Sequence, residues 1–254
     1  MKRFLLSLII LSTLLFLVGC IPFGMPPERG NAPPPSDTQI APAPEPEPAP
    51  TPEPDIDPPD LSPPTLSGFV EYNNPGAGFT IQYPIAWFLI DDGISEADVR
   101  DAINEVFGEE VPNMLEDLGA DFSSTLVYWY DFENSTDYFT PNVNLSADDS
   151  GGLTQNDLKS PAIQEELQAA FDELYPLLFG GYTMVEELQG RALGENYFAL
   201  FKFTADINQI HAGFYQAITE HNGVLYTFSL TTFDYLLNST APAFEQMLST
   251  LRFN

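Results

Sequence analysis

The chain has 254 residues, of which 37 are acidic and eight are basic, so its formal net charge is −29 at pH 7. Proteins that bind nucleic acid neutralise phosphates with a basic patch, so this charge balance excludes nucleic-acid binding. It also disfavours adsorption to anionic lipid headgroups, and leaves solubility, a cationic partner or divalent cations as explanations of the acidic residues.

The first twenty residues indicate export and lipid attachment. Two basic residues precede an apolar run over 4–18, which is shorter than the roughly twenty residues that a membrane-spanning helix needs but fits the apolar part of a secretory signal. The run ends in Leu-Val-Gly followed by Cys20, and this motif resembles the lipobox of bacterial lipoproteins. The resemblance implies that the Cys20 thiol receives a diacylglyceryl group and that residues 1–19 are cut off as a signal peptide.

Cys20 is the only cysteine of the chain, so an intramolecular disulfide is not available to it. Two or more acyl chains hold a protein stably on a bilayer. The alternative is a simple signal peptide or signal anchor with an incidental cysteine, but the basic start, the apolar run and the cysteine all agree with a lipid anchor. We therefore expect a membrane-anchored lipoprotein on an extracytoplasmic face, either the cell surface or the periplasmic side, with Cys20 as its lipid attachment site.

Residues 20–66 are predicted to form a disordered linker between the lipid and a folded domain. The segment APAPEPEPAPTPEPDIDPPD (41–60) alternates proline with alanine, threonine and acidic residues. Because proline fixes φ and lacks an amide N–H, we expect an extended, semi-rigid spacer of polyproline II character. The other interpretation is a docking ligand for an aromatic groove, but no PxxP with flanking basic residues stands out.

Residues 67–254 are predicted to form one α+β domain. Five segments of its first half read as strands: 68–74, 78–84, 87–92, 125–132 and 142–146. Two helices are expected among them, one capped by Ser95 and one over 112–118. A third helix is expected to begin at Pro161, and Pro176 is expected to end or kink it.

The second half gives the clearest sheet pattern. Residues 196–205 read as a strand, and 209–233 as a hairpin around Asn222-Gly223, the preferred pair for a type I′ turn. This turn places Tyr215 opposite Leu230 and Ala217 opposite Phe228. The reverse face of the hairpin is also apolar: Phe214, Ile218, Leu225 and Phe233. We therefore expect cover on both sides of a largely antiparallel sheet. A terminal helix is expected after Pro242, with an apolar stripe of Phe244, Met247, Leu248 and Leu251.

The segment GFTIQYPIAWF (78–88) resembles the opening signature of PsbP-like domains, also called the Mog1/PsbP or DUF1795-like group. The matching positions are Gly78, Phe79, Ile81, Tyr83, Pro84 and Trp87. The resemblance implies an α/β/α sandwich on a mainly antiparallel sheet. It implies little chemistry, because the group includes photosystem II extrinsic subunits, nuclear-transport factors and bacterial lipoproteins of unknown role. We interpret the signature residues as structural: a turn glycine, a strand-ending proline and core aromatics.

The sequence shows no assembled catalytic set. It lacks the HExxH, CxxC, phosphate-loop and G-x-S-x-G motifs. The hairpin register places His211 opposite Asp234, a pair that could orient a general base or a metal ligand; we favour a cross-strand polar contact. His221 is expected to be exposed beside the turn. The acidic segments 90–98 and 146–152 lack the twelve-residue spacing of a calcium loop, so a solvated acidic face is favoured.

The sequence therefore favours a non-enzymatic binding or assembly module, anchored through Cys20, with a protein partner for which a cationic surface is one option. We assign no catalytic residue, cofactor or metal ligand. Two alternatives remain: a hydrolase or metal-dependent enzyme whose site is invisible in the sequence, with His211 and Asp234 as its only nameable pair, and a calcium-dependent adhesion module.

Overall fold

The computed structural model describes residues 66–90, 125–136, 139–207 and 210–254. The predictions for the signal peptide, Cys20, the linker and the two helices expected between 93 and 118 lie outside these residues. Among the described helices, none combines the length and the apolar character that crossing a membrane requires.

A small antiparallel sheet contains the expected first hairpin. Its strands β1 (Phe69–Asn74) and β2 (Phe79–Pro84) pair in full register, and β10 (Arg252–Phe253) from the end of the chain pairs with the other edge of β2. The structural interpretation of the signature is confirmed: Gly78 has φ +70° in the turn, and the Phe79 and Trp87 side chains are buried. The short strand β10 was not predicted.

The large sheet has seven strands in the order β3-β4-β5-β9-β8-β7-β6, and all of its pairs are antiparallel. Its strands are β3 (Phe88–Ile90), β4 (Thr125–Tyr130), β5 (Asn142–Asp149), β6 (Gly180–Leu193), β7 (Asn196–Ile207), β8 (Ile210–His221) and β9 (Val224–Phe233). The sequence analysis missed β6. This strand lies at the edge of the sheet and its register with β7 shifts at three places, so its apolar residues do not alternate regularly.

The β8–β9 hairpin confirms the predicted turn and register. Asn222 and Gly223 have φ of 52° and 82°, the positive values that a type I′ turn needs at both central residues. Tyr215 lies opposite Leu230, and Ala217 lies opposite Phe228.

The two long helices form as expected, but both prolines were misjudged. Helix α5 (Pro161–Leu178) continues through Pro176 to Leu178, and α6 (Leu237–Ser249) begins five residues before Pro242. Pro176 lies in the last turn of α5, where little helix remains to be disrupted. In α6, buried contacts of Leu237 and Ala241 hold the first turn on the sheet. The short helices are η2 (Phe132–Asn134), α4 (Gln155–Leu158) and η3 (Asp234–Leu236).

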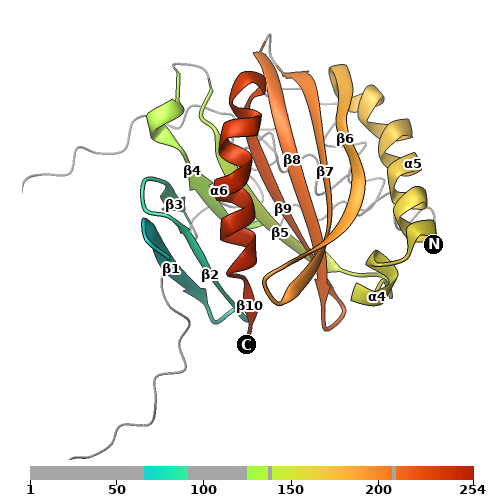
Figure 1. The fold of residues 1–254 in the computed structure, drawn as a ribbon, viewed down its shortest axis with the longest axis horizontal. Helices are drawn as coiled ribbons and strands as arrows, with labels where there is room; N and C mark the ends of the chain where they lie inside the picture. Colours follow the sequence, from blue (N-terminus) through green and yellow to red (C-terminus); the bar gives the residue numbers. More distant parts are fainter. Residues whose placement is uncertain (1–65, 91–124, 137–138, 208–209) are drawn as a thin grey trace, which may run out of the picture. The chain divides into compact units, whose positions relative to one another are not determined.

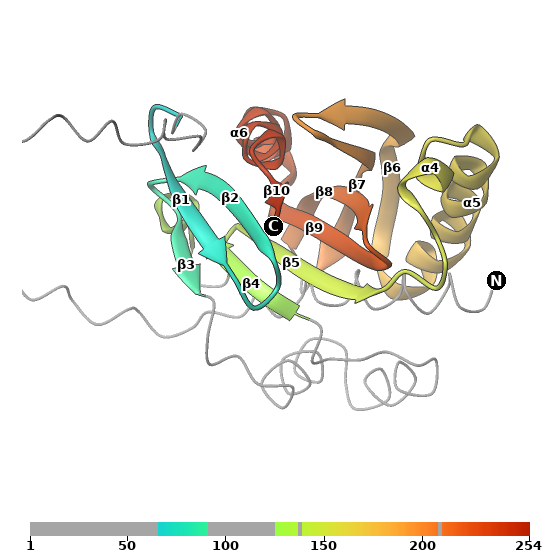
Figure 2. The same ribbon diagram turned by 90° about the horizontal axis from the view of Figure 1, so that it is seen from below.

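The helices cover opposite faces of the large sheet (Figures 1 and 2). Helix α5 packs Leu167, Phe171 and Tyr175 into one core with Phe203 of β7. Helix α6 and the small sheet close a second core on the other face, with the following members among others: Phe79, Trp129, Phe228, Phe244 and Leu248. This arrangement confirms the α/β/α sandwich on a mainly antiparallel sheet. We call the two sides the α5 face and the α6 face.

Candidate functional site: a charged network beneath helix α6

The predicted pairing of His211 with Asp234 is wrong. Strand β9 ends at Phe233 and Asp234 begins η3, so the hairpin register stops before it reaches this pair. His211 instead lies opposite Asp206 of β7, and its Nδ1 is 2.7 Å from Asp206 Oδ1. Both side chains are about half exposed, at 47% and 54%. The pair is the cross-strand polar contact that we favoured, but with a different partner.

The remaining sequence candidates lie apart from His211. His221 is at the opposite end of β8, half-buried rather than exposed, because its ring stacks on Phe253 at 4.3 Å. The acidic segment 146–152 uses Asp149 in its own turn, where Oδ1 accepts a hydrogen bond from the Gly151 N–H at 2.7 Å. Across the described ranges, no group of three or more His, Cys, Asp or Glu side chains is placed to hold a metal ion.

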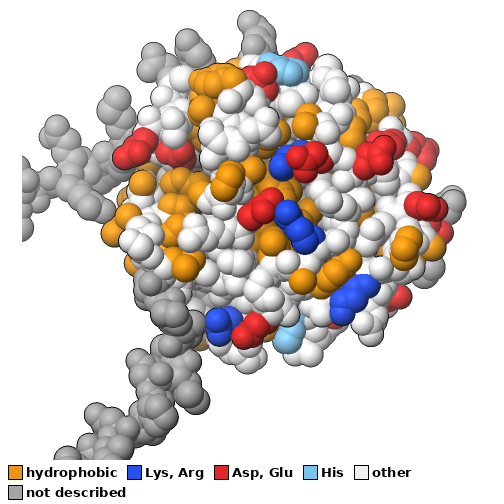
Figure 3. Space-filling view, viewed as in Figure 1, with side chains coloured by type: hydrophobic (Ala, Val, Ile, Leu, Met, Phe, Trp, Pro, Cys, Tyr) orange, Lys and Arg blue, Asp and Glu red, His pale blue; other side chains and the backbone are white. Residues whose placement is uncertain are grey.

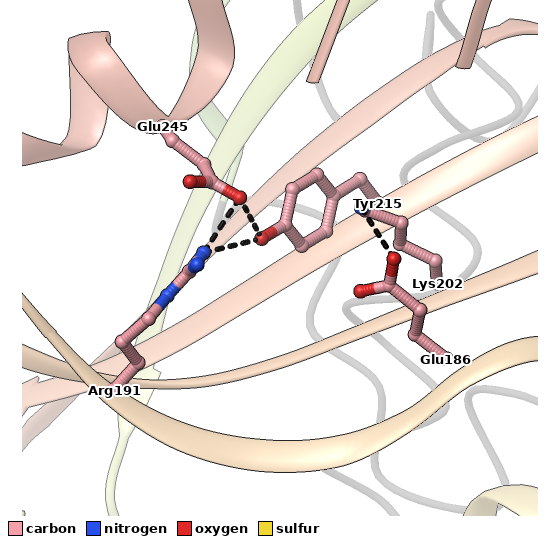
Figure 4. Close-up of polar contacts among 5 residues, drawn as sticks. All are labelled: Glu186, Arg191, Lys202, Tyr215 and Glu245. Carbon is pink, nitrogen blue, oxygen red and sulfur yellow. Dashed lines mark hydrogen bonds and ion pairs between the residues drawn. The ribbon is translucent and has the colours of Figure 1, made fainter. Parts of the chain in front are cut away.

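Charged side chains do gather beneath α6, at positions that the sequence analysis did not single out. Five side chains from three strands and the helix form what we call the α6 network (Figure 4): Glu186 and Arg191 of β6, Lys202 of β7, Tyr215 of β8 and Glu245 of α6. The sheet register lines up three of them, because Lys202 lies opposite both Glu186 and Tyr215.

The Tyr215 side chain lies between two ion pairs. Glu245 Oε1 accepts a hydrogen bond from Tyr215 Oη at 2.6 Å and lies 2.6 Å from Arg191 Nη2. Arg191 Nη2 also donates to Tyr215 Oη at 2.9 Å. On the other side, Lys202 Nζ lies 2.8 Å from Glu186 Oε1 and 4.6 Å from the centroid of the Tyr215 ring, within cation–π range.

Strand alternation explains why Lys202 is in this place. In β7, Phe201 and Phe203 point to the α5 face, so Lys202 points to the α6 face, where it is 9% exposed. A buried ammonium is costly unless it is paired, and Glu186 supplies the pair. On α6, Phe244 packs edge-to-face on Tyr215 at 5.2 Å, which brings the neighbouring Glu245 to the phenol. The lysine inside the run NYFALFKFTA is the signal from which sequence reasoning could have found this network.

The environment fixes the protonation states of the network. Burial raises the pKa of Tyr215 well above its ordinary value, and the hydrogen bond to the Glu245 carboxylate raises it further. Burial alone would raise the pKa of Glu245, but the hydrogen bonds from Tyr215 and Arg191 outweigh it and lower that pKa. At neutral pH the phenol is therefore neutral and the carboxylate is ionised.

The outer edge of the network reaches solvent. The Arg191 and Glu186 side chains are 41% and 40% exposed, while Tyr215 and Lys202 beneath them are buried. The space-filling view shows acidic and basic side chains next to one another near the middle of this face, with hydrophobic side chains between them (Figure 3). The arrangement holds α6 on the sheet and presents a fixed pattern of both charges at the surface.

No family model matches the chain, and no curated protein matches it. Solved structures are similar at low identity. Cyanobacterial PsbP from Synechocystis is 12% identical, with 74% of this chain and 94% of that chain covered and a TM-score of 0.45. The Ran-binding protein Mog1p of Saccharomyces cerevisiae is 8% identical, with 73% and 95% covered and a TM-score of 0.41. A Bacteroides thetaiotaomicron protein is 15% identical over 74% of this chain, with a TM-score of 0.43, and the match spans 49% of that protein.

Proposed function

We propose that the chain is a membrane-anchored, extracytoplasmic lipoprotein whose folded domain is a non-enzymatic binding module. In this proposal residues 1–19 are the signal peptide, Cys20 carries the lipid, residues up to 66 form the linker, and 67–254 form the binding domain. The lipobox-like motif and the proline-rich composition support the first three parts.

The α6 network carries the binding role. Its charges are held in place by hydrogen bonds and ion pairs, between Glu245 and Arg191 on one side of Tyr215 and between Glu186 and Lys202 on the other. Fixed charges of both signs at a partly exposed edge suit the recognition of a complementary surface. Because the rest of the chain is strongly acidic, the complementary surface that we propose is a protein face with a net positive charge.

No observation on the described residues favours the other candidate functions. The only pair named for an enzyme, His211 and Asp234, does not form, because His211 contacts Asp206. Of the two acidic segments considered for calcium, 91–98 lies outside the described residues, and in 146–152 the Asp149 carboxylate accepts a hydrogen bond within its own turn.

Lipid attachment is tested by expressing the full chain in a bacterium that is fed an alkyne-bearing fatty acid. We expect the label on the mature protein, with Cys20 at the N-terminus by intact mass. The Cys20→Ser variant should lose the label and leave the membrane fraction. A mature wild-type protein without the label, or one that keeps residues 1–19, would contradict the anchor.

The binding surface is tested by site-specific photo-cross-linking on the host membrane. A cross-linking amino acid replaces Gln246, which is exposed on α6, and in a matched variant it replaces Leu177, which is exposed on α5. We expect a discrete cross-linked species from position 246 only, and its weakening when Glu186→Gln removes an exposed negative charge at the edge of the network. The same species from both positions, or from neither, would remove the α6 face as the partner surface.

A further inference from the structure

The side chain of Gln82 is buried on the side of β2 where an exposed polar residue is expected. Phe79 and Ile81 of the same strand point into the core beneath α6, so strand alternation places Thr80 and Gln82 on the other side. Thr80 is half-buried there, whereas Gln82 is only 2% exposed. Buried polar side chains are uncommon and are nearly always hydrogen-bonded, so the partners of Gln82 indicate its role.

The side-chain amide of Gln82 holds the point at which the proposed linker meets the domain. Leu66, the last residue assigned to the linker, donates its backbone N–H to Gln82 Oε1 at 2.8 Å. Two backbone hydrogen bonds fix the residues that follow, from the Phe69 N–H to the Leu66 carbonyl at 3.1 Å and from the Ile85 N–H to the Gly68 carbonyl at 2.9 Å. The chain therefore enters β1 from a fixed position.

The main chain of Gln82 is joined to the C-terminal end of α6. Strand β10 pairs Arg252 with Thr80, and continuing this register places Thr250, the residue after α6, opposite Gln82. Thr250 Oγ1 accepts a hydrogen bond from the Gln82 N–H at 2.8 Å and donates one to the Met247 carbonyl of α6 at 2.6 Å. Figure 1 shows α6 leading directly into β10 beside β2. One buried residue therefore connects the linker exit with the helix of the α6 network.

We infer that Gln82 is a positioning residue that joins the linker exit and α6 into one rigid unit, so that the linker presents the α6 face in a fixed direction. We call Leu66, Gln82 and Thr250, with the hydrogen bonds between them, the Gln82 junction. The inference rests on the proposed function, because it concerns how an anchored domain presents its binding face.

The composition of the linker gives the Gln82 junction its use. A proline-rich chain is semi-rigid and keeps its direction over several residues, and Pro63-Pro64 directly precede Thr65 and Leu66. Such a linker can orient a domain only if the residue where the two meet is held in place. The hydrogen bond from Leu66 to Gln82 holds that residue, and the hydrogen bond from Gln82 to Thr250 passes the constraint to α6.

The chain offers a matched pair of glutamine variants for the test. Gln82→Met removes the acceptor of the Leu66 N–H while keeping the length of the side chain. Gln168→Met is the control, because Gln168 Oε1 on α5 accepts the Leu188 N–H at 2.7 Å, the same kind of bond at a site away from the linker exit. A third variant, Thr250→Val, removes the acceptor of the Gln82 N–H and tests the other half of the Gln82 junction.

The distance between the linker exit and α6 is measured in the full chain by double electron–electron resonance. Non-canonical amino acids at positions 65 and 246 carry the spin labels, so the measurement does not depend on Cys20. We expect a single narrow distance peak in the wild type and in Gln168→Met, and its loss to a broad distribution in Gln82→Met and Thr250→Val. In hydrogen exchange, the Leu66 amide should exchange about five- to tenfold faster in Gln82→Met only, the change expected for one hydrogen bond.

The inference is overturned if the wild-type distribution is broad, if Gln82→Met keeps the wild-type width, or if Gln168→Met broadens it as much. A Leu66 amide that exchanges as fast in the wild type as in an unfolded peptide would overturn it without any variant. The two proposals can fail separately. A narrow peak without a cross-link from position 246 would contradict the proposed function alone, whereas a broad peak with that cross-link would contradict the Gln82 junction alone.

Discussion

The two faces of the large sheet differ in the polar side chains that they bury. On the α6 face Lys202 and Glu245 are paired within the α6 network, although the Thr232 hydroxyl and the Trp129 indole N–H on this face have no partner among the described residues. On the α5 face the buried polar side chains are mainly uncharged, and four of their atoms lack a partner among the described residues; the exception is Glu220, whose carboxylate accepts hydrogen bonds from the backbone N–H groups of Gln155 and Gly223. Adjacent residues of one strand separate the two environments, since Lys202 lies on one side and Phe201 and Phe203 on the other.

The difference follows from the cost of burial. An unpaired ion in a protein interior is far more costly than an unpaired hydroxyl or amide. The ions are therefore held where Arg191 and Glu186 still reach solvent. Neutral side chains on the α5 face, such as Asn142, Gln216 and Ser229, are at most 2% exposed. The comparison teaches that this fold buries ions only where a paired charge and an exposed edge are both available, and buries neutral polar groups away from water.

The largest effect is expected from the aromatic cluster on the α5 face. Phe203 contacts five other rings there, including Phe214 at 4.4 Å and Tyr175 at 4.8 Å. Phe203→Ala should lower the free energy of unfolding by about 3–5 kcal/mol, because it leaves a cavity in a packed core. Urea denaturation measures this. The control Phe88→Ala, at a partly exposed position, should cost much less; equal losses would show that the α5 core is loosely packed.

A smaller effect is expected from breaking one ion pair of the α6 network, and its size should depend on which partner is removed. Glu186→Gln leaves the buried Lys202 ammonium without its carboxylate and should cost about 1–3 kcal/mol of unfolding free energy. Lys202→Met leaves a carboxylate that is 40% exposed to water and should cost about 1 kcal/mol or less. Equal losses in urea denaturation would contradict the view that Lys202 is the buried member.

The Tyr215 hydroxyl should contribute about 1 kcal/mol, with a distinctive pH dependence. Tyr215→Phe removes the donor to Glu245 at 2.6 Å, a hydrogen bond to a charged group on the partly exposed edge of the network. Because the folded protein raises the pKa of Tyr215, the stability that this phenol contributes is present below about pH 10, its ordinary value, and is lost as pH rises through the folded pKa.

At acid pH the stability contributed by Glu245 depends on pH in the opposite direction to that of Tyr215. The folded protein lowers the pKa of Glu245, so its stabilising effect is present above the ordinary pKa of glutamate and is lost as pH falls through the folded pKa. Melting temperatures from pH 3 to pH 11 should therefore show a flatter alkaline limb in Tyr215→Phe and a flatter acid limb in Glu245→Gln. Limbs parallel to those of the wild type would remove the network from the control of stability.

The sequence alone predicted the strands and their register correctly where the alternation of apolar residues agrees with the turn residues. Asn222-Gly223 set the register of β8 and β9 over ten residue pairs, and the alternation of Phe214 with Tyr215 correctly placed apolar cover on both faces. Strand β6 could not be predicted in this way, because its register shifts interrupt the alternation. The end of β9 at Phe233, which separates His211 from Asp234, depends on the packing of the helices that follow: a Cβ on Gly213 would lie 2.9 Å from Leu237.

The candidate sites were harder to predict than the fold. The α6 network joins residues from three strands and a helix, and only the sheet order shows that β6, β7 and β8 are neighbours. Two local signals were nevertheless present in the sequence. Lys202 interrupts an aromatic run, and the alternation NVNLS in β5 places asparagine and serine where a core residue was expected. Both are uncharacteristic of a strand that is buried on both faces.

The smallest effect is expected at the one histidine that the sequence singled out. His211 and Asp206 are about half exposed, and exposed pairs contribute about 0–1 kcal/mol because solvent screens them. His211→Ala should therefore change the melting temperature by at most a few degrees. It should also leave the cross-link from position 246 unchanged, because His211 does not belong to the α6 network. Loss of the cross-link in a folded His211→Ala protein would mean that function resides at the β7–β8 end of the sheet, and that the comparison of the two faces addresses the wrong sites.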